Sequence, residues 1–471
     1  MYALRRTKVV CTLGPATDSV EDLRRLVSAG MDVARLNFSH GTHEEHRAKL
    51  EQLRQACELE RKSVATLQDL SGPKVRTGVF GRNFDLPSGA NVVLLEGDTS
   101  SDERVIPIQY EGLARDVRAG DRILFDDGRL VLAVQSIDGG RVSARVDQGG
   151  EMRDNVGVHL PSRTMRITAL TDKDKKDLVF GLSNEIDFIA MSFVRRAEDI
   201  SQIREICQAW GAPTPVIAKI ETPDAVENIE SVAAASDGVM VARGDLGVEF
   251  PPERVPVIQR QILGAARLVR RPVIVATEML QSMTKSTRPT RAEASDVANA
   301  VFAGTDCVML SGETATGEHP HLACSMMSRI AMEAETSPFF EQAPYVSRAT
   351  SVAEAIARGA CNTAREIGAK FIVAFTESGS SAMNVSLARP HVPIIAYSPN
   401  AKIRRRMALY WGVVPREMPS REHDTDQLVN WCTGDLLAAG YGSPGERVVI
   451  VFGAPIGVSG STNTIRVHVL G

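Results

Sequence analysis

The segments Val216-Ile-Ala-Lys-Ile-Glu-Thr222 and Val239-Met-Val-Ala-Arg-Gly-Asp-Leu-Gly247 decide how this sequence of 471 residues folds. Each begins with an apolar, largely β-branched run, which predicts a short buried strand of a parallel sheet. The first run stops at Lys219 and Glu221, and the second stops at Asp245. Burying such charges costs on the order of several kcal/mol each unless they pair, bind a metal or meet a charged ligand. A functional site is therefore expected where these strands end.

Similar apolar runs recur along the first 340 or so residues, and amphipathic stretches separate them. This alternation is typical of βα units and predicts a parallel sheet. The predicted strands are Lys8–Thr12, Val33–Asn37, Val64–Leu70, Phe188–Phe193, Val216–Ile220, Val239–Ala242, Val273–Thr277 and Cys307–Leu310. The predicted helices include Val20–Ala29, Glu44–Glu60, Asp172–Leu182, Ala197–Trp210, Pro223–Ala235, Glu253–Val269, Arg291–Ala303 and Leu322–Glu335. Eight such units predict a closed (β/α)8 barrel of the TIM type.

One connection is far longer than the others, because some hundred residues separate the third strand from the next helix. Within it the pattern changes to short alternating segments with turn signals such as Asp138-Gly139-Gly140. This predicts an inserted all-β domain over residues 72–166, between barrel segments 1–71 and 167–337. The insertion leaves the barrel at the carboxyl ends of the strands, where barrel active sites lie, so we expect it to act as a lid.

A second α/β domain is predicted over residues 338–471. It opens with a helix over 351–368 and a strand over Phe371–Thr376, followed by a helix over 381–388 and a strand over Pro393–Tyr397. The next predicted helix, over 402–411, carries Arg404-Arg405-Arg406, which we expect to form a solvated face rather than a ligand patch.

The bulk composition describes an ordinary globular protein, with 43% hydrophobic and 24% charged residues. A formal net charge of −4 argues against a general nucleic-acid binder, because no basic excess is present to neutralise phosphates. The seven cysteines form no C-x-x-C pair and are expected mostly in the core. No signal peptide or membrane-length apolar run is present, so a cytoplasmic location and no membrane partner are expected.

The predicted strand ends carry an unusual number of polar residues, and in a barrel these converge on one mouth. They are Arg35, Asn37, Ser39, Asp69, Lys219, Glu221, Asp245 and Thr277. A surface ion pair or a helix cap is the alternative for any one of them taken singly. Their occurrence on successive strands favours a shared site.

Several longer motifs closely resemble those of pyruvate kinases, in the same order and over essentially the whole chain. They are Ala34-Arg-Leu-Asn-Phe-Ser-His-Gly41, Gly72-Pro-Lys-Val-Arg-Thr-Gly78, Ile217-Ala-Lys-Ile-Glu221, Met240-Val-Ala-Arg-Gly-Asp-Leu-Gly247, Arg288-Pro-Thr-Arg-Ala-Glu293 and Met309-Leu-Ser-Gly-Glu-Thr-Ala315. The resemblance implies a barrel, a β lid and a C-terminal regulatory domain, usually in a homotetramer. It also implies transfer of a phosphoryl group from phosphoenolpyruvate to ADP, with the enolate that remains protonated to pyruvate.

The residues at the strand ends suit that chemistry. Glu221 and Asp245 are hard oxygen ligands for Mg²⁺ or Mn²⁺, with substrate and water completing the coordination. The Lys219 ammonium would neutralise charge on the transferring phosphoryl group and on the enolate. Arg35 offers a planar donor fork for phosphate.

Thr277 ends an apolar strand, and its hydroxyl is expected to face the C3 methylene that must gain a proton. Because a threonine hydroxyl is a poor acid, we expect it to relay the proton through a water. The alternative is a strand-end hydroxyl that merely satisfies backbone groups. The backbone N–H groups around Gly244 and Asp245 are expected to bind the substrate carboxylate.

The resemblance assigns Arg76 and His40 to the phosphates of ADP or ATP. The lid departs from the family pattern at Asp154-Asn-Val-Gly-Val-His-Leu-Pro161, where relatives often have lysines ahead of Gly-Val-Asn-Leu-Pro. One nucleotide contact of the family is therefore expected to be lost in this chain.

A second departure concerns potassium. In much of the family Asn, Ser, Asp and a threonine carbonyl hold K⁺, and the glycine-proline motif carries a glutamate. Asn37, Ser39 and Asp69 match this pattern, but Leu70 replaces the threonine and Lys74 replaces the glutamate. A lysine ammonium can stand in for K⁺, so we predict activity without added K⁺. The alternative is that Lys74 is an ordinary exposed lysine.

A further anion site is predicted in the C-terminal domain, where a strand leads through a hydroxyl-rich loop into a helix. The loop consists of Thr376, Glu377, Ser378, Gly379, Ser380 and Ser381. Similar enzymes bind a sugar-phosphate effector there, and a nucleotide is also possible; a simple helix N-cap is the alternative.

Two other functions fit parts of the pattern. A Schiff-base aldolase also places a lysine at a barrel strand end, but the carboxylates of metal-binding type argue against it. A non-catalytic sensor would keep the barrel and bind a sugar phosphate at 376–381. The presence of all the expected catalytic side chains argues against that alternative.

Overall fold

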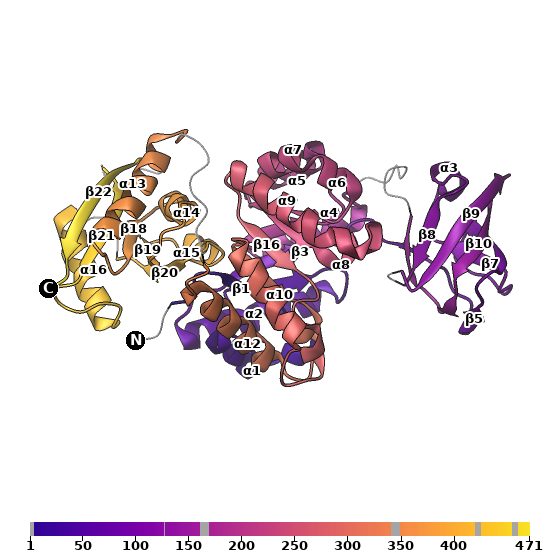
Figure 1. The fold of residues 1–471 in the computed structure, drawn as a ribbon, viewed down its shortest axis with the longest axis horizontal. Coiled ribbons are helices and arrows are strands. Elements are labelled where there is room, and N and C mark those ends of the chain that lie inside the picture. Colours follow the sequence, from indigo (N-terminus) through magenta and orange to yellow (C-terminus); the bar gives the residue numbers. More distant parts are fainter. Residues whose placement is uncertain (1–3, 127, 161–168, 341–348, 420–424, 455–459) are drawn as a thin grey trace.

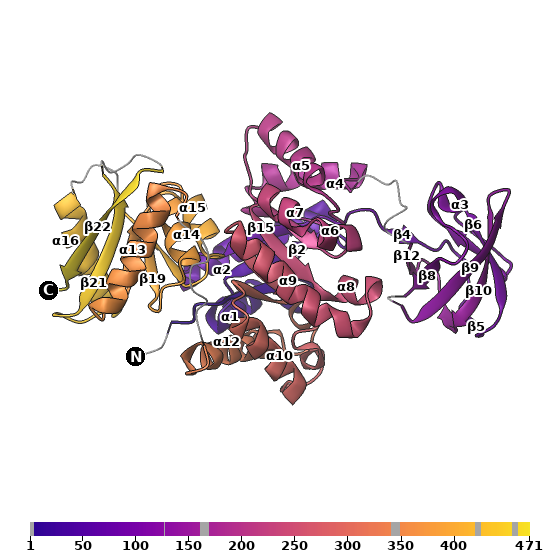
Figure 2. The same cartoon turned by 45° about the horizontal axis from the view of Figure 1, so that its top comes forward.

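The structure is a computed structural model that describes residues 4–126, 128–160, 169–340, 349–419, 425–454 and 460–471. Figure 1 shows three parts in a row, with a barrel in the middle, a β-rich part on one side and an α/β part on the other. Figure 2 shows the same order after rotation, and the β-rich part stands off from the barrel in both views. Among the described residues no helix is long and apolar enough to cross a membrane.

Eight parallel strands of the described chain close into a barrel in the order β1-β17-β16-β15-β14-β13-β3-β2. Their bounds are β1 Lys8–Thr12, β2 Val33–Asn37, β3 Ala65–Asp69, β13 Phe188–Met191, β14 Val216–Ile220, β15 Gly238–Ala242, β16 Val273–Ala276 and β17 Cys307–Leu310. The predicted barrel is confirmed. Four strands have the predicted bounds, and the other four differ by one or two residues at an end.

Alternation along the strands divides the apolar residues between two layers. Val10, Ile217, Met240 and Ile274 belong to one buried cluster, whereas their strand neighbours such as Val9 belong to the cluster that also includes helix residues. Ala408 and Leu409, two residues of the C-terminal part, belong to the same buried cluster as Val10 and Ile217. The backbone carbonyl of Leu409 accepts a bond from the buried Cys307 thiol at 3.4 Å. The C-terminal part therefore packs against the end of the barrel where the strands begin.

Helices cover the outside of the barrel and begin at the expected capping residues. The capping-box pairs Thr42 with Glu45 and Thr290 with Glu293 satisfy the first free N–H groups of their helices. The bounds are α1 Val20–Ala29, α2 His43–Glu60, α4 Asp172–Ser183, α5 Ala197–Ala209, α6 Pro223–Glu227, α7 Ile229–Ala235, α8 Arg243–Glu249, α9 Val255–Leu268, α10 Arg291–Phe302, α11 Gly312–Ala315 and α12 Pro320–Thr336, with 3₁₀ turns η1 Pro15–Thr17, η2 Pro252–Arg254 and η3 Gln281–Thr284.

Most of the predicted barrel helices agree with the structure to within two residues at each end, and two of them differ in kind. The helix predicted over 223–235 is broken at Asn228, whose side-chain amide donates to the Arg195 carbonyl at 3.1 Å instead of extending one helix. The helix predicted over 253–269 begins as a 3₁₀ turn and becomes α-helical at Val255.

The inserted part contains a seven-stranded sheet in the order β4-β12-β8-β9-β10-β6-β7 and a separate pair, β11-β5. The bounds are β4 Val75–Arg76, β5 Phe84–Leu86, β6 Asn91–Glu96, β7 Val105–Ile108, β8 Arg122–Phe125, β9 Leu130–Asp138, β10 Arg141–Gln148, β11 Gly150–Met152 and β12 Gly157–His159. The predicted β class of the insertion is confirmed, and one four-residue helix, α3 Leu113–Asp116, packs on this sheet. The predicted boundary at 166 and 167 lies outside the described residues.

The C-terminal part is a five-stranded sheet in the order β20-β19-β18-β21-β22, with β22 antiparallel to β21. The bounds are α13 Val352–Glu366, β18 Ile372–Phe375, α14 Ser380–Leu387, β19 Ile394–Ser398, α15 Ala401–Met407, β20 Val413–Glu417, α16 Thr425–Ala438, β21 Arg447–Gly453 and β22 Thr462–Val469. The predicted α/β class of this part is confirmed.

The expectation that Arg404, Arg405 and Arg406 form a solvated face was wrong, because all three side chains are partly buried and Arg404 donates to the Ser398 and Pro399 carbonyls at 3.0 and 2.9 Å. Arg405 Nε donates to both carboxylate oxygens of Asp187 at 3.2 Å, and Asp187 is fully buried at the start of β13. Arg406 donates to the Pro213 carbonyl at 3.3 Å. Arg405 and Arg406 therefore join α15 to the end of the barrel where the strands begin. Sequence periodicity misses this because the partners lie about two hundred residues away.

We expect Arg405→Met to lower the free energy of unfolding by about 3 kcal/mol, because it leaves the Asp187 carboxylate buried without its cation. Urea titration followed by circular dichroism would measure the change. Arg466→Met is the matched control, since Arg466 is 38% exposed and pairs with the 77% exposed Asp426, and such a pair contributes about 1 kcal/mol or less. Equal losses in the two variants would contradict a structural role specific to Arg405.

Candidate active site

The Lys219 ammonium lies between two carboxylates at the carboxyl end of β14. Its Nζ is 3.4 Å from Asp69 Oδ1 and 3.4 Å from Glu221 Oε2, and it donates to Ser192 Oγ at 2.7 Å. The lysine side chain is 13% exposed and both carboxylate side chains are 1% exposed. Three of the residues predicted from the sequence are thus brought together. Ser192, which follows β13, was not selected from the sequence, where it lies inside the strand predicted over Phe188–Phe193.

Burial and charge act in opposite directions on this group. Burial on its own lowers the pKa of the Lys219 ammonium, but the carboxylates of Asp69, Glu221 and Asp245 outweigh burial and hold the pKa above its ordinary value. Burial raises the pKa of Asp69, yet Lys219 and Arg35 together bring it below its usual range. Lys219 is therefore a charged ammonium at neutral pH.

Arg35 extends this charge network from β2. Its Nε donates to Asp69 Oδ2 at 2.7 Å and its Nη1 donates to Thr12 Oγ1 at 2.9 Å. The Nη2 group has no hydrogen-bond partner in the described part of the chain. Arg35 is therefore held in place on one edge and has a donor left for a ligand on the other.

One oxygen of Glu221 accepts a hydrogen bond, and the other faces the Lys219 ammonium at 3.4 Å. Its Oε1 accepts a bond from the Phe193 N–H at 2.6 Å, whereas Oε2 is buried and has no hydrogen-bond partner among the described residues. Burial raises the pKa of this carboxyl to about 7, against the opposing effect of Lys219. Asp245, the third residue of α8, adds negative charge that acts on both side chains.

These observations fit a hard divalent cation. A buried carboxylate oxygen that accepts no hydrogen bond, and has only an ammonium at 3.4 Å, is available as a metal ligand. Within the described ranges no group of three or more His, Cys, Asp or Glu side chains is arranged to hold a metal alone. Mg²⁺ is commonly held by one or two carboxylates together with substrate oxygens and water, so Glu221 and Asp245 match that mode.

Thr277 has a strained backbone. Its φ is 68° and that of the next residue, Glu278, is 54°, so two consecutive residues with side chains occupy the left-handed region. Such conformations cost about 1–3 kcal/mol each and cluster at functional sites. The Thr277 hydroxyl donates to the Ala276 carbonyl at 2.6 Å and accepts the Gly244 N–H at 2.7 Å.

The last contact bears on the predicted role of Gly244. Its N–H already has an acceptor in Thr277, so it would reach a substrate carboxylate only by giving up that bond. A Cβ at Gly244 would lie 3.5 Å from Thr277 Oγ1, an ordinary contact, so packing within the chain does not require glycine here. The structure therefore places Gly244 next to the site and does not test its role in binding.

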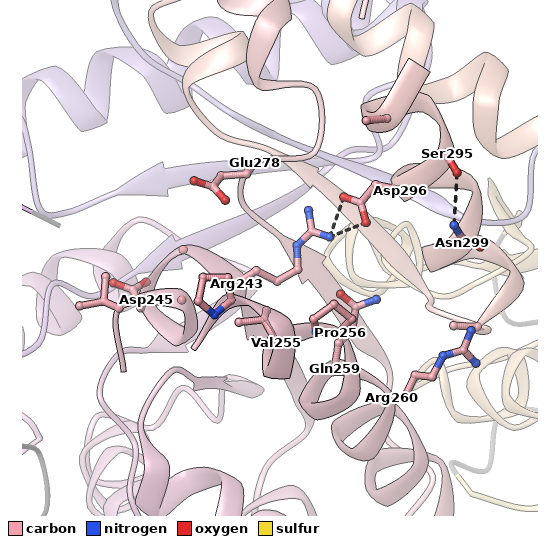
Figure 3. Close-up of a pocket in the computed structure, with 16 residues that line it drawn as sticks. Arg243, Asp245, Val255, Pro256, Gln259, Arg260, Glu278, Ser295, Asp296 and Asn299 are labelled. Carbon is pink, nitrogen blue, oxygen red and sulfur yellow. Dashed lines mark hydrogen bonds and ion pairs between the residues drawn. The ribbon is translucent and has the colours of Figure 1, made fainter. Parts of the chain in front are cut away.

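Arg243, the first residue of α8, was not selected from the sequence. Its Nη2 donates to the Thr277 carbonyl at 2.7 Å, and its Nη1 contacts Asp296 Oδ2 at 2.7 Å. Figure 3 shows the guanidinium directed at Asp296 on α10, with Glu278 and Asp245 to one side. These residues line an open cavity of about 1060 Å³ beside the barrel mouth.

The two predicted nucleotide residues line a smaller cavity, of about 280 Å³, between the inserted sheet and the barrel. Arg76, on β4, donates to the Asn155 carbonyl at 2.9 Å, and His40 follows β2. Burial lowers the pKa of the His40 ring, and the cations Lys74, Arg76 and Arg35 lower it further. His40 is therefore neutral near pH 7. Lys74 and Arg76 supply cations on the side of the inserted sheet, which suits a phosphate, whereas the barrel side carries Asp245 and Glu249.

His159 and Glu249 face the same cavity and were missed by the sequence analysis. Burial raises the pKa of the Glu249 carboxyl to about 7, although His159 opposes this and Asp224 and Asp245 support it. Glu249 was hard to select from the sequence, because it faces His159 of the inserted sheet, some ninety positions away in the chain.

We expect Glu249→Gln to remove part of the pH dependence of stability. Because the folded-state pKa of about 7 lies above the ordinary 4.5, stability from this group is complete below pH 4.5 and is lost as the pH rises to about 7. Glu249→Gln should therefore raise the melting temperature at pH 8 more than at pH 5. Differential scanning calorimetry of the metal-free protein at both pH values measures this, and an equal shift at both would contradict it.

The potassium-type residues lie around Asp69. Asn37 Oδ1 accepts the Ser39 N–H at 3.2 Å, and the Leu70 carbonyl accepts Ser192 Oγ at 2.6 Å. Asp69 already faces two cations, Arg35 and Lys219. Lys74 lines the smaller of the two cavities, together with Asp245.

The predicted effector loop lies between β18 and α14. Gly379, at φ 85°, donates its N–H to Thr376 Oγ1 at 2.9 Å, which is turn chemistry of the N-cap kind. Ser381 Oγ shares a hydrogen bond of 2.6 Å with Thr462 Oγ1. Ser378 Oγ donates to Ser380 Oγ at 3.1 Å, so all four hydroxyls of the loop make a hydrogen bond within the protein, and the geometry fits both the effector site and the simple cap.

The site combines a buried ammonium among carboxylates with a cavity that is lined by Lys74 and Arg76. This combination is typical of a barrel enzyme that acts on a phosphorylated anion. Comparison with known proteins makes the class specific. The family model described as "Pyruvate kinase, barrel domain" matches residues 4–324, and the one described as "Pyruvate kinase, alpha/beta domain" matches residues 354–468. The chain belongs to the pyruvate kinase family.

Relatives include the pyruvate kinase of Corynebacterium glutamicum, which is 44% identical over 99% of this chain and 98% of its own length. The pyruvate kinase of Staphylococcus epidermidis is 42% identical over 99% of this chain and 81% of its own length. The pyruvate kinase of Geobacillus stearothermophilus is 42% identical over 99% of this chain and 80% of its own length.

Proposed function

We propose that this chain transfers the phosphoryl group of phosphoenolpyruvate to ADP, giving pyruvate and ATP. The observation that carries the proposal is the Lys219 ammonium, held 3.4 Å from both Asp69 and Glu221 at the carboxyl ends of the barrel strands. Family membership supports the same reaction. A fixed cation in a site with little water stabilises charge on a transferring phosphoryl group without solvent reorganisation.

Glu221 and Asp245 would hold Mg²⁺ or Mn²⁺, which supplies charge neutralisation to the phosphoryl oxygens and the enolate when bound. Arg35 would bind a phosphoryl oxygen through the edge not used by Asp69. Thr277 would relay the proton that C3 of the enolate gains. Arg76 and His40 would bind nucleotide phosphates in the cavity under the inserted sheet.

The charge state of Lys219 argues against the Schiff-base alternative. An amine must be neutral to attack a carbonyl, and its pKa must then be lowered. Here the surrounding carboxylates raise the pKa of Lys219 above its ordinary value. Borohydride reduction in the presence of pyruvate would label Lys219 if that alternative held.

Regulation and assembly complete the proposal. We expect a sugar phosphate or nucleotide effector at 376–381 and a homotetramer, both because the family resemblance implies them. The sensor alternative would bind such an effector without turnover. An assay of pyruvate formation with a panel of sugar phosphates, alongside light scattering, examines these expectations together.

A coupled assay of pyruvate formation from phosphoenolpyruvate and ADP tests the proposed reaction. Turnover should require Mg²⁺ or Mn²⁺ and should be lost when a chelator removes the metal. Purified Lys219→Met, prepared in parallel, reports the background from contaminating enzymes. Wild-type protein that forms pyruvate no faster than this background would refute the proposal.

A further inference from the structure

The turn after β16 holds two residues in a conformation that side chains disfavour. Thr277 and Glu278 both have positive φ, at 68° and 54°. A β-branched residue at such an angle persists only when its surroundings impose it. Contacts from α8 to the Thr277 carbonyl and hydroxyl hold the turn in this conformation.

Arg243 makes several of these contacts. Its Nη2 and Nε donate to the Thr277 carbonyl at 2.7 and 3.3 Å, and Nη2 also lies 2.8 Å from the Met279 sulfur. The next residue along α8, Gly244, donates its N–H to the Thr277 hydroxyl. One arginine and its neighbour thus hold both the carbonyl and the hydroxyl of Thr277.

The guanidinium is itself held from α10. Nη1 lies 2.8 Å from Asp296 Oδ1 and 2.7 Å from Oδ2. The Arg243 side chain is 11% exposed, whereas that of Asp296 is 38% exposed. Figure 3 shows the Arg243 guanidinium next to the Asp296 carboxylate, with Arg260 apart from both. The planar fork of arginine serves Thr277 and Asp296 at once, which a lysine cannot do.

We propose that Arg243, held by Asp296, is a positioning residue that keeps the Thr277 hydroxyl oriented for proton transfer at C3 of the enolate. The inference rests on the proposed function and adds a residue to it. The hydroxyl donates to the Ala276 carbonyl and accepts from Gly244, which leaves one lone pair to accept a bond from a water that carries the proton. Without Arg243, the turn is free to relax and the hydroxyl to rotate away.

The step can be followed in reverse without phosphoryl transfer. A C3–H bond of pyruvate breaks, its proton passes to the water, and the electron pair forms the enolate double bond as the carbonyl oxygen takes the charge. In D₂O a deuteron returns to C3, so no oxidant or reductant is needed. NMR of the pyruvate methyl signal, with Mg²⁺ and inorganic phosphate in place of the transferred group, measures the exchange rate.

We expect Arg243→Lys to slow exchange at C3 at least tenfold while the KM for phosphoenolpyruvate changes less than twofold. Thr277→Ala should slow exchange similarly, and adding Arg243→Lys to it should change the rate less than twofold further. The matched control is Arg260→Lys, because Arg260 lines the same cavity without a hydrogen bond or ion pair to the described residues. It should leave exchange unchanged.

Asp296→Asn is the second variant, in case Arg243→Lys does not fold. It weakens only the exposed side of the same network, and we expect it to slow exchange about threefold at an unchanged melting temperature. Exchange within twofold of wild type in both single variants would overturn the inference. So would an equal effect of Arg243→Lys with and without the Thr277 hydroxyl. If wild type shows neither exchange nor pyruvate formation, the proposed function itself fails.

Discussion

Lys219→Met should lower kcat for pyruvate formation by about a thousandfold or more, with a much smaller change in the KM for phosphoenolpyruvate. Removing one donor that stabilises developing negative charge typically costs about 10²–10³ in kcat, and Lys219 carries a full charge beside both phosphoryl group and enolate. Steady-state kinetics in saturating Mg²⁺ measures the loss.

The variant should still fold, which makes the kinetic result interpretable. Asp69 keeps Arg35 as a partner at 2.7 Å, and the raised pKa of Glu221, about 7, allows that carboxyl to take a proton. Lys219→Arg keeps the positive charge and changes its position. We expect it to be little more active than Lys219→Met, because a guanidinium does not fit the distances to both carboxylates. Activity within tenfold of wild type in Lys219→Met would contradict the central role of the ammonium.

Lys74→Glu should make the enzyme depend on potassium. Wild type is expected to turn over in a buffer free of Na⁺ and K⁺, whereas the variant should lose about a hundredfold or more in rate there. Added K⁺ should restore much of that loss, because the family pattern pairs a glutamate at this position with a bound K⁺. Initial rates across a K⁺ titration, with tetramethylammonium holding the ionic strength constant, measure both effects.

Lys74 is exposed at the smaller cavity and makes no hydrogen bond or ion pair to a described residue, so it acts on the site from a distance. Lost hydration lowers the pKa of the Lys74 ammonium, Lys219 and Arg76 lower it further, and Asp245 and Asp69 oppose them. The ammonium therefore acts on the same carboxylates that a bound monovalent cation would serve. A carboxylate there would instead add repulsion to Asp69 and Asp245.

Two controls separate this effect from general charge changes. Lys175→Glu alters the same charge on α4, where Lys175 is 54% exposed, and should leave the rate unchanged with or without K⁺. Lys74→Met should slow the enzyme without creating a strong K⁺ requirement. Strong activation of wild type by K⁺ would refute the tethered-cation idea and make Lys74 an ordinary exposed lysine.

The strands of the barrel were accessible from the sequence because apolar, β-branched runs reflect burial on both faces of a parallel sheet. Val216–Ile220 and Cys307–Leu310 were predicted to the residue. The break at Asn228 was not accessible, since it depends on a bond from that side chain to the Arg195 carbonyl. The local sequence pattern therefore predicts which residues form a strand or helix, but it does not predict the distant residues that contact the ends of that element.

The candidate site divides in the same way. Lys219, Glu221 and Asp69 could be selected because a charge at the end of an apolar strand conflicts with its surroundings in the sequence itself. Ser192, Arg243 and Glu249 were not selected. Their contacts, such as that of Arg243 with the Thr277 carbonyl, form only in the folded chain.

Hydrophobic periodicity along the chain, a property of neighbouring residues, is enough to specify eight βα units and to locate charges such as Lys219 at their ends. The pairing of Lys219 with Asp69, the clamp of Arg243 on Thr277 and the burial of Arg405 against Asp187 arise only when the barrel closes and the C-terminal part docks. Each of these joins residues tens to hundreds of positions apart. Their distances depend on how whole elements pack, which no local pattern records.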